Sequence, residues 1–208
     1  MTKIYQAHAV NDTKEAAIQM LFQFLKGMIS FSEKEKQAIR DSIDIQEFAK
    51  GTTLLREGEY ASQCYFLLRG CVRKYYVVDG EEKTTAFYTE GQPINAMVSQ
   101  QNKTASTFYL ECLEDIIVTT GTAETEAAFF ERFPRFETVC RIQTEEMLGE
   151  LEETVAQYMI SNPEQRYRSL METRPELLAR VPQYHLASYI GVKPESLSRI
   201  RKRILTRS

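Results

Sequence analysis

Charged side chains recur at helical spacing near the C-terminal end of the chain. Glu195, Arg199 and Lys202 follow one another at steps of four and three, which places them on one face of a helix. Ser196 stands beside Glu195. An arginine can donate two hydrogen bonds to a guanine edge, and a glutamate can accept one from a cytosine amino group. This pattern predicts a surface that reads DNA bases through Glu195, Ser196 and Arg199, and an ion pair between Glu195 and Arg199 would be compatible with that role.

The same segment concentrates positive charge. The chain carries a formal net charge of −3, with 26 basic and 29 acidic residues. Six of the basic residues and only one acid lie from Lys193 onward, so this end is at about +5 and the preceding body at about −8. Such asymmetry points to a terminal module that binds a polyanion. Contacts with DNA phosphates are predicted for Lys193, Lys202, Arg203 and Arg207.

The element that must hold these side chains is a helix-turn-helix. Two helices that cross steeply need a small residue where they touch and a glycine in the turn, and Ala187 and Gly191 meet both needs. Lys193-Pro194 starts the second helix, where a proline has no amide to lose. Aliphatic residues fill the expected wedge between the helices: Leu186, Ile190, Val192, Leu197 and Ile200. An unrelated helical hairpin is the alternative.

A long helix that begins near Phe136 precedes this module. Its apolar residues fall at steps of three, four and three, the spacing of a coiled-coil seam, and they are Leu148, Leu151, Val155 and Tyr158. A second copy of the chain is the expected partner, which predicts a homodimer. The alternative is that the seam packs against the chain's own barrel. Further helix starts are expected at Asn162-Pro163, Arg174-Pro175 and Val181-Pro182.

The segment from Ile45 to Thr120 has the pattern of an antiparallel barrel or sandwich. Short β-branched and aromatic runs alternate with glycines, and Asp79-Gly80 predicts a tight hairpin turn. Helices are expected before it, over Lys14 to Met28 and from the capping box Ser32-x-x-Glu35. The expected strands are Cys64 to Leu68, Val72 to Val78, Lys83 to Tyr88 and Phe108 to Cys112.

Several functional classes are disfavoured by the sequence. No apolar run reaches the roughly 18 residues needed to cross a bilayer, and the N-terminus lacks the pattern of a signal peptide, so no membrane association and a cytoplasmic location are expected. The four cysteines and two histidines lack metal-ligand spacing, so no metal is expected. No phosphate-binding loop, nucleophile elbow or recognisable catalytic carboxylate pair is present, so the chain is not expected to be an enzyme.

Three stretches together resemble the superfamily of the cyclic AMP receptor protein and the fumarate-nitrate regulator (Crp/Fnr). They are Lys50 to Glu59, Tyr65 to Gly70, and the recognition-helix run Glu195 to Arg199. The resemblance implies an α+β fold with a cyclic-nucleotide-binding-like double-stranded β-roll (jelly roll), a long dimerisation helix and a C-terminal helix-turn-helix domain. The expected ranges are 1–135, 136–160 and 161–208. It further implies a transcription regulator whose partners are double-stranded DNA, a second copy and RNA polymerase.

The chain departs from the family pattern in the effector pocket. Asn95 and Ala96, followed by Met97, stand where nucleotide-binding members have Gly-Glu, and Ala105, followed by Ser106, stands where they have an arginine. A phosphate buried without a cation would lose its hydration uncompensated. Cyclic AMP is therefore not expected as effector, no cofactor is expected, and the identity of any other small-molecule effector stays open.

A second departure lies at the C-terminus, where the sequence ends without a clear β-hairpin wing after the recognition helix. This predicts weaker, strongly salt-dependent DNA binding. The alternative function is a β-roll that binds a ligand or a protein and has lost specific DNA contact. Activation and repression are not distinguished by the sequence, and neither are the target genes.

Overall fold

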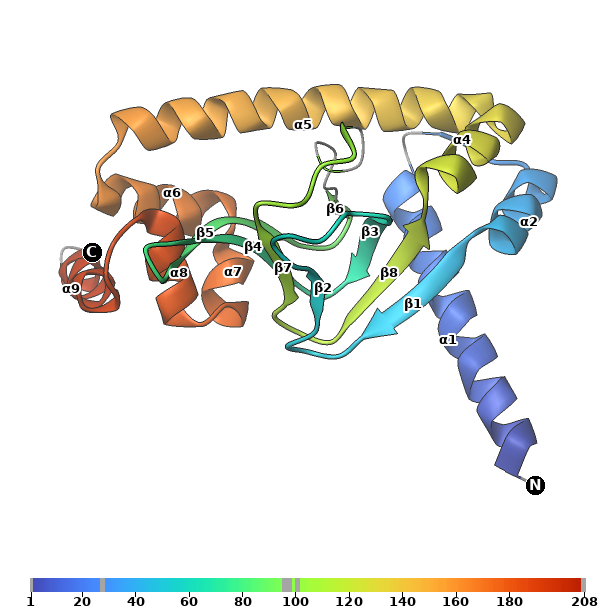
Figure 1. Ribbon diagram of the computed structural model, residues 1–208, viewed down its shortest axis with the longest axis horizontal. Helices are drawn as coiled ribbons and strands as arrows, with labels where there is room; N and C mark the ends of the chain where they lie inside the picture. Colours follow the sequence, from blue (N-terminus) through green and yellow to red (C-terminus); the bar gives the residue numbers. More distant parts are fainter. Residues whose placement is uncertain (1, 27–28, 95–98, 100–101, 207–208) are drawn as a thin grey trace. The chain divides into compact units, whose positions relative to one another are not determined.

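The computed structural model describes residues 2–26, 29–94, 99 and 102–206 (Figure 1). The chain forms two compact units. The first comprises Met1–Val72 with Phe87–Cys140, and the second comprises Arg73–Ala86 with Arg141–Ser208. No helix of the described part is both long and apolar enough to cross a bilayer.

The first unit is built on antiparallel strands. One sheet has the order β1-β8-β3-β6 and contains β1 (Asp44–Phe48), β8 (Ile116–Gly121), β3 (Cys64–Arg69) and β6 (Pro93–Ile94). The register aligns Phe48 with Ile116 and Leu67 with Val118. β2 (Thr53–Leu55) pairs with β7 (Tyr109–Cys112) in the other sheet. The strands are held by an aliphatic interior in which Leu67 and Val118 are fully buried.

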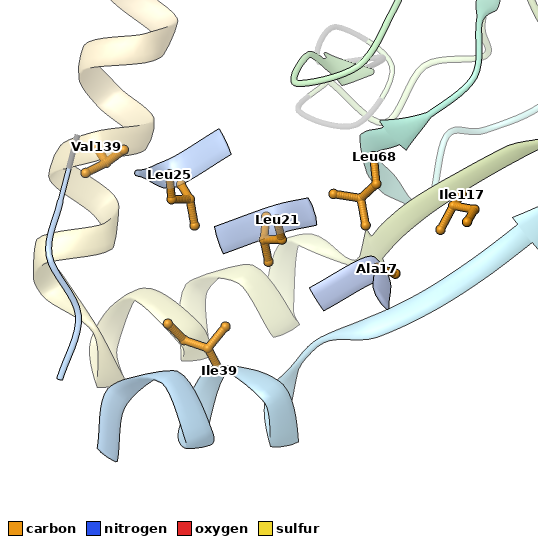
Figure 2. Packing of buried hydrophobic residues seen from close by; sticks show 7 residues of the cluster. All are labelled: Ala17, Leu21, Leu25, Ile39, Leu68, Ile117 and Val139. Carbon is orange, nitrogen blue, oxygen red and sulfur yellow. The ribbon is translucent and has the colours of Figure 1, made fainter. Parts of the chain in front are cut away.

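Helices cover one part of this unit: α1 (Thr2–Leu25), α2 (Glu33–Ser42), α4 (Ala123–Arg132) and the start of α5 (Pro134–Ile160). Figure 2 shows their shared core, which comprises Ala17, Leu21 and Leu25 of α1, Ile39 of α2, Leu68, Ile117 and Val139. The helix predicted over Lys14 to Met28 is thus confirmed as far as Leu25, although it begins earlier, at Thr2, and Met28 lies outside the described residues. The predicted capping box is confirmed, because Ser32 Oγ accepts from the Glu35 amide and the Ser32 amide donates to Glu35 Oε2.

The second unit joins a hairpin to the C-terminal helices. The hairpin consists of β4 (Val72–Val78) and β5 (Glu81–Tyr88). At the ends of these strands away from the turn, Val72, Phe87 and Tyr88 belong to the first unit. Its turn is the predicted Asp79-Gly80, with φ of 54° and 78°, values that the left-handed region of a tight hairpin turn requires. The helices are the rest of α5, α6 (Pro163–Thr173), α7 (Pro175–Arg180), α8 (Gln183–Ile190) and α9 (Pro194–Leu205).

The helix starts follow local chemistry. Asn162 caps α6 with Pro163 at its first turn, and α7 and α9 also begin at a proline, as expected. α8 begins one residue after Pro182. The long helix begins at Pro134, two residues before the predicted Phe136. The predicted α+β class, with two antiparallel sheets followed by helices, is confirmed.

Candidate nucleic-acid interface

α8 and α9 are joined by a tight turn at Gly191. The Gly191 φ and ψ are 81° and 36°, and the turn is closed by the Val192 amide, which donates to the Ala187 carbonyl at 2.9 Å. This is the arrangement by which a glycine ends a helix and reverses the chain. The fully buried Ala187 and Leu197 lie within this pair of helices, as the requirements of the motif predicted. The other residues of the predicted wedge are buried or half-buried: Leu186, Ile190, Val192 and Ile200.

The side chain of Tyr158 lies close to Gly191. A Cβ placed on it would lie 2.6 Å from Tyr158 Oη of α5, a distance that real Cβ contacts essentially never show. The left-handed backbone therefore strains any other residue at this turn, and the Tyr158 hydroxyl would have to move to make room for a Cβ.

α9 separates into an apolar and a polar face. Leu197, Ile200 and Ile204 are buried. The exposed face carries Glu195, Ser198, Arg199 and Lys202, at positions i, i+3, i+4 and i+7. Ser196, which the sequence placed among the base-reading residues, is half-buried, whereas Ser198 lies on the exposed stripe and was missed. The helical spacing itself could have identified Ser198.

Glu195 and Arg199 of this stripe are open to solvent. Arg199 Nε donates only a long hydrogen bond, 3.4 Å, to the backbone carbonyl of Glu195. Within the part of the chain that the structure describes, no ion pair joins the Glu195 carboxylate to the Arg199 guanidinium. Both groups thus keep most of their hydrogen-bonding capacity for a ligand.

The basic residues around this stripe differ in their surroundings. Lys193 is the exposed N-cap residue of α9, and Lys202 is exposed on its last turn. Arg203 is 51% exposed, but its guanidinium forms an ion pair of 2.7 Å with Glu164 of α6. Arg207 lies outside the described residues. Lys193 also acts on the hairpin: the pKa of Glu81 is lowered, mainly by Lys83 and to a smaller extent by the charge of Lys193.

The β4–β5 hairpin is fastened to α8 by contacts that the sequence did not reveal. The Ser188 hydroxyl of α8 donates to the Glu82 carbonyl at 2.9 Å and accepts from the Thr84 amide at 2.9 Å. Arg73 of β4 is 2% exposed and pairs with the Glu82 carboxylate at 2.6 Å. Its other terminal nitrogen donates to Nδ1 of the buried His185. The hairpin and the first helix of the motif therefore form one packed body.

His185 is held neutral by this environment. Burial, and to a smaller extent the adjacent Arg73 charge, lower the pKa of His185 to about 4, while Glu82 opposes the shift. A neutral ring can accept the Arg73 hydrogen bond at Nδ1. Nothing in the spacing of the two histidines in the sequence pointed to this cluster.

The predicted coiled-coil seam is exposed on α5. Leu148, Leu151, Val155 and Tyr158 are 57, 58, 50 and 49% exposed in the single chain. Met147 and Met159 add to this apolar surface, with 37 and 80% exposed. A run of large apolar side chains at coiled-coil spacing on an exposed helix is typical of a protein-protein contact.

The sequence predicted a degenerate effector pocket at Asn95, Ala96, Met97, Ala105 and Ser106. Asn95, Ala96 and Met97 lie outside the described residues. Ala105 is exposed. Ser106 is buried, and its hydroxyl donates to the Phe108 carbonyl at 2.9 Å while its amide donates to the Glu59 carbonyl at 2.7 Å. The backbone hydrogen bond of Ser106 thus holds the loop around Gly58-Glu59 in place.

A small pocket lies beside that loop. Its volume is about 140 Å³, and Leu55, Glu59, Tyr65 and Leu110 are among its lining residues. Pockets that enclose drug-sized ligands are usually larger, on the order of 300 Å³ or more. Among the described residues, those that line it supply no positive charge for a phosphate.

Comparison with known proteins places this geometry in context. Residues 45–133 match the cyclic nucleotide-binding domain family. No curated protein sequence is a match. The fold is similar to that of the c-di-GMP responsive global regulator CLP of Xanthomonas campestris, with a TM-score of 0.67 and 15% identity over 85% of this chain and 93% of that chain.

Two further solved structures share the fold. A CooA variant from Carboxydothermus hydrogenoformans has a TM-score of 0.64 and 14% identity, covering 82% of this chain and 79% of its own. FixK2 from Bradyrhizobium japonicum has a TM-score of 0.63 and 18% identity, covering 79% and 85% respectively. The predicted cyclic-nucleotide-binding-like domain is thus confirmed, and the fold is similar to that of these three solved structures.

Proposed function

We propose that this chain, whose residues 45–133 are a cyclic nucleotide-binding domain, is a sequence-specific DNA-binding transcription regulator of the Crp/Fnr type. The observation that carries the proposal is the exposed polar stripe of α9, backed by the buried apolar face of the same helix. In this proposal residues 1–135 carry the β-roll, 136–160 hold two copies together and 161–208 bind DNA. Contact with RNA polymerase would follow from the regulatory role.

The chemistry of the stripe fits the edges of base pairs in the major groove. Arg199 offers two parallel donors to a guanine, Glu195 offers an acceptor to a cytosine amino group, and Ser198 can serve either base type. Ser196 is half-buried, so its role would be smaller than the sequence pattern predicted. Readout would therefore rest on Glu195, Ser198 and Arg199.

Phosphate contacts would come from the exposed cations that flank the stripe. Lys193 and Lys202 are the best placed, since both are exposed on α9 or at its start. Arg203 would first have to release Glu164, whose side chain is only 20% exposed, so its contact with a phosphate would be weaker than those of Lys193 and Lys202. Neutralised phosphates release counterions, which makes binding fall steeply with salt.

Two copies joined along α5 would present two such stripes. The exposed seam supports this arrangement, because pairing would remove its four half-exposed apolar side chains from water. A symmetric dimer reads a nearly palindromic site whose half-sites lie about 34–36 Å apart, one turn of the duplex.

The effector is not expected to be cyclic AMP. The small pocket, the absence of a cation among the residues that line it, and the internal use of the Ser106 hydroxyl all support this part of the proposal. A phosphate would gain no charged partner there to offset its lost hydration.

The experiment is a selection of bound fragments from a genomic DNA library by the purified full chain, at two salt concentrations. The wild-type protein is expected to enrich a near-palindromic site. Arg199→Ala is expected to lose discrimination between that site and random DNA by roughly a hundredfold, since a bidentate base contact is worth about 1–3 kcal/mol and a dimer has two.

Two variants act as controls. Lys202→Ala should weaken all sequences alike and lower the slope of affinity against salt by about one per removed phosphate contact. Lys34→Ala, an exposed lysine of α2, should change neither quantity. Failure of the wild-type protein to enrich any site would refute DNA reading and favour a β-roll that binds a ligand or a protein.

A further inference from the structure

One arginine contacts the C-terminal ends of two helices at once. Arg166 of α6 donates from Nε to the carbonyl of Ile190, the last residue of α8, at 2.8 Å. From Nη1 it donates to the Ser161 carbonyl, one residue beyond α5, at 2.5 Å and, over 3.4 Å, to the Tyr158 carbonyl in the last turn of α5. Its guanidinium also lies over the Tyr158 ring, 4.4 Å from the centroid.

These contacts suit an arginine and no other side chain. The last carbonyls of a helix have no partner within the helix, and they carry the negative end of its dipole. A planar guanidinium has five donors in a fixed fork, so it can satisfy carbonyls of two helices while its face stacks on an aromatic ring. Lysine would keep the charge but offer a single point of contact.

The geometry ties the seam helix to the turn of the motif. Tyr158 is a seam residue of α5, and its hydroxyl crowds Gly191, the turn between α8 and α9. The Arg166 guanidinium lies over the same ring and binds the carbonyl next to that turn. All of these residues belong to the second unit.

We propose that Arg166 is a positioning residue that fixes the direction of α9 relative to α5 and thereby sets the spacing between DNA half-sites that the dimer accepts. The inference rests on the proposed function, because spacing has meaning only for a DNA-binding dimer. One base pair more or less moves a half-site by about 3.4 Å and turns it around the helix axis by about 35°. If α9 is held rigidly relative to α5, the dimer binds a site with altered spacing poorly. If α9 can move, the dimer binds such a site nearly as well.

The first test measures spacing preference in Arg166→Gln. Half-sites taken from the selected sequence are joined by spacers from two base pairs shorter to two longer, and affinity for each duplex is measured. The wild-type protein is expected to prefer one spacing by about tenfold or more, the penalty of losing one good contact per site. In Arg166→Gln the preference should fall to within about threefold, with the base preference inside each half-site unchanged.

A matched control lies on the same helix. Arg168 of α6 pairs with Glu164 at 3.0 Å, and among the described residues it makes no hydrogen bond or ion pair with α5 or α8, so Arg168→Gln makes the same chemical change without removing the contacts of Arg166. It should keep the wild-type spacing profile. If Arg166→Gln fails to fold, Arg166→Lys is measured in its place, with an intermediate broadening expected. A variant that weakens binding to every spacer equally would show a merely structural role and overturn the proposal.

A second test needs no DNA. Spin labels are attached through keto amino acids at positions 149 on α5 and 198 on α9, diluted with unlabelled protein, and the distance distribution is measured. Arg166→Gln should broaden it at least about twofold relative to wild type and Arg168→Gln. If the distance distributions of Arg166→Gln and wild type are equally wide, the inference is overturned, even if the wild-type protein binds DNA. If the distribution broadens in Arg166→Gln but the wild-type protein selects no DNA site, only the proposed function is refuted.

Discussion

Acidification should destabilise the protein through a single histidine. His185 is 6% exposed, and its Nδ1 faces the guanidinium of Arg73. The other groups around it are the Glu82 carboxylate, which pairs with Arg73 at 2.6 Å, and the Tyr184 ring, 4.1 Å away between centroids. Protonation would bring a second positive charge against Arg73 and remove the acceptor of its hydrogen bond. Folding therefore opposes protonation of this ring.

The sign and size follow from the two pKa values. In the unfolded chain the histidine pKa is near 6.5, and in the folded protein it is lowered to about 4. Between these values the unfolded state binds a proton that the folded state does not, so stability falls as pH drops from 6.5 to 4 and levels off below. The full loss is about 3 kcal/mol, with a slope of at most about 1.4 kcal/mol per pH unit within the window.

The assay compares wild type with His185→Gln. Glutamine keeps an oxygen that can accept from Arg73, but it does not titrate. Urea unfolding followed by circular dichroism at pH 7 and pH 5 gives the free energy of unfolding for each protein, and carboxylate effects common to both cancel in the comparison. The chain has only two histidines, so the variant also assigns the His185 resonance in an NMR titration.

A His185 resonance that titrates near pH 6.5 would refute the reasoning. So would equal loss of stability in the two proteins between pH 7 and pH 5. A low-pH midpoint together with a smaller loss in the variant is the expected result.

Three other substitutions test the packing directly. Gly191→Ala should destabilise the chain by about 2 kcal/mol or more in urea unfolding, because φ is 81° and the new methyl meets Tyr158 Oη. Gly149→Ala should instead stabilise it by about 1 kcal/mol, since a Cβ there meets nothing within 4 Å inside a helix. Leu151→Glu should raise the dimer dissociation constant at least about a hundredfold in sedimentation equilibrium, and an unchanged constant would reject the seam.

The sequence determined the features that depend on near neighbours in the chain. The capping box at Ser32, the N-cap at Asn162 and the hairpin turn at Asp79-Gly80 could all be predicted, because each involves groups within about three residues. The turn at Gly191 and the buried face of α9 belong to the same class, since the whole helix-turn-helix occupies one contiguous stretch. The charge at the C-terminal end needed only composition.

Tertiary structure decided which side chains are available to bind DNA and which are already used in contacts within the chain. Arg203 was predicted to meet phosphate, yet it pairs with Glu164 of another helix. Ser188 and His185 looked like ordinary residues of α8, but they hold a hairpin about a hundred positions earlier in the chain. Arg166 showed no signal at all, although it joins α5 to the turn before α9. Such contacts form between elements distant in sequence, and hydrophobic periodicity predicts which face of a helix is buried without specifying its partner.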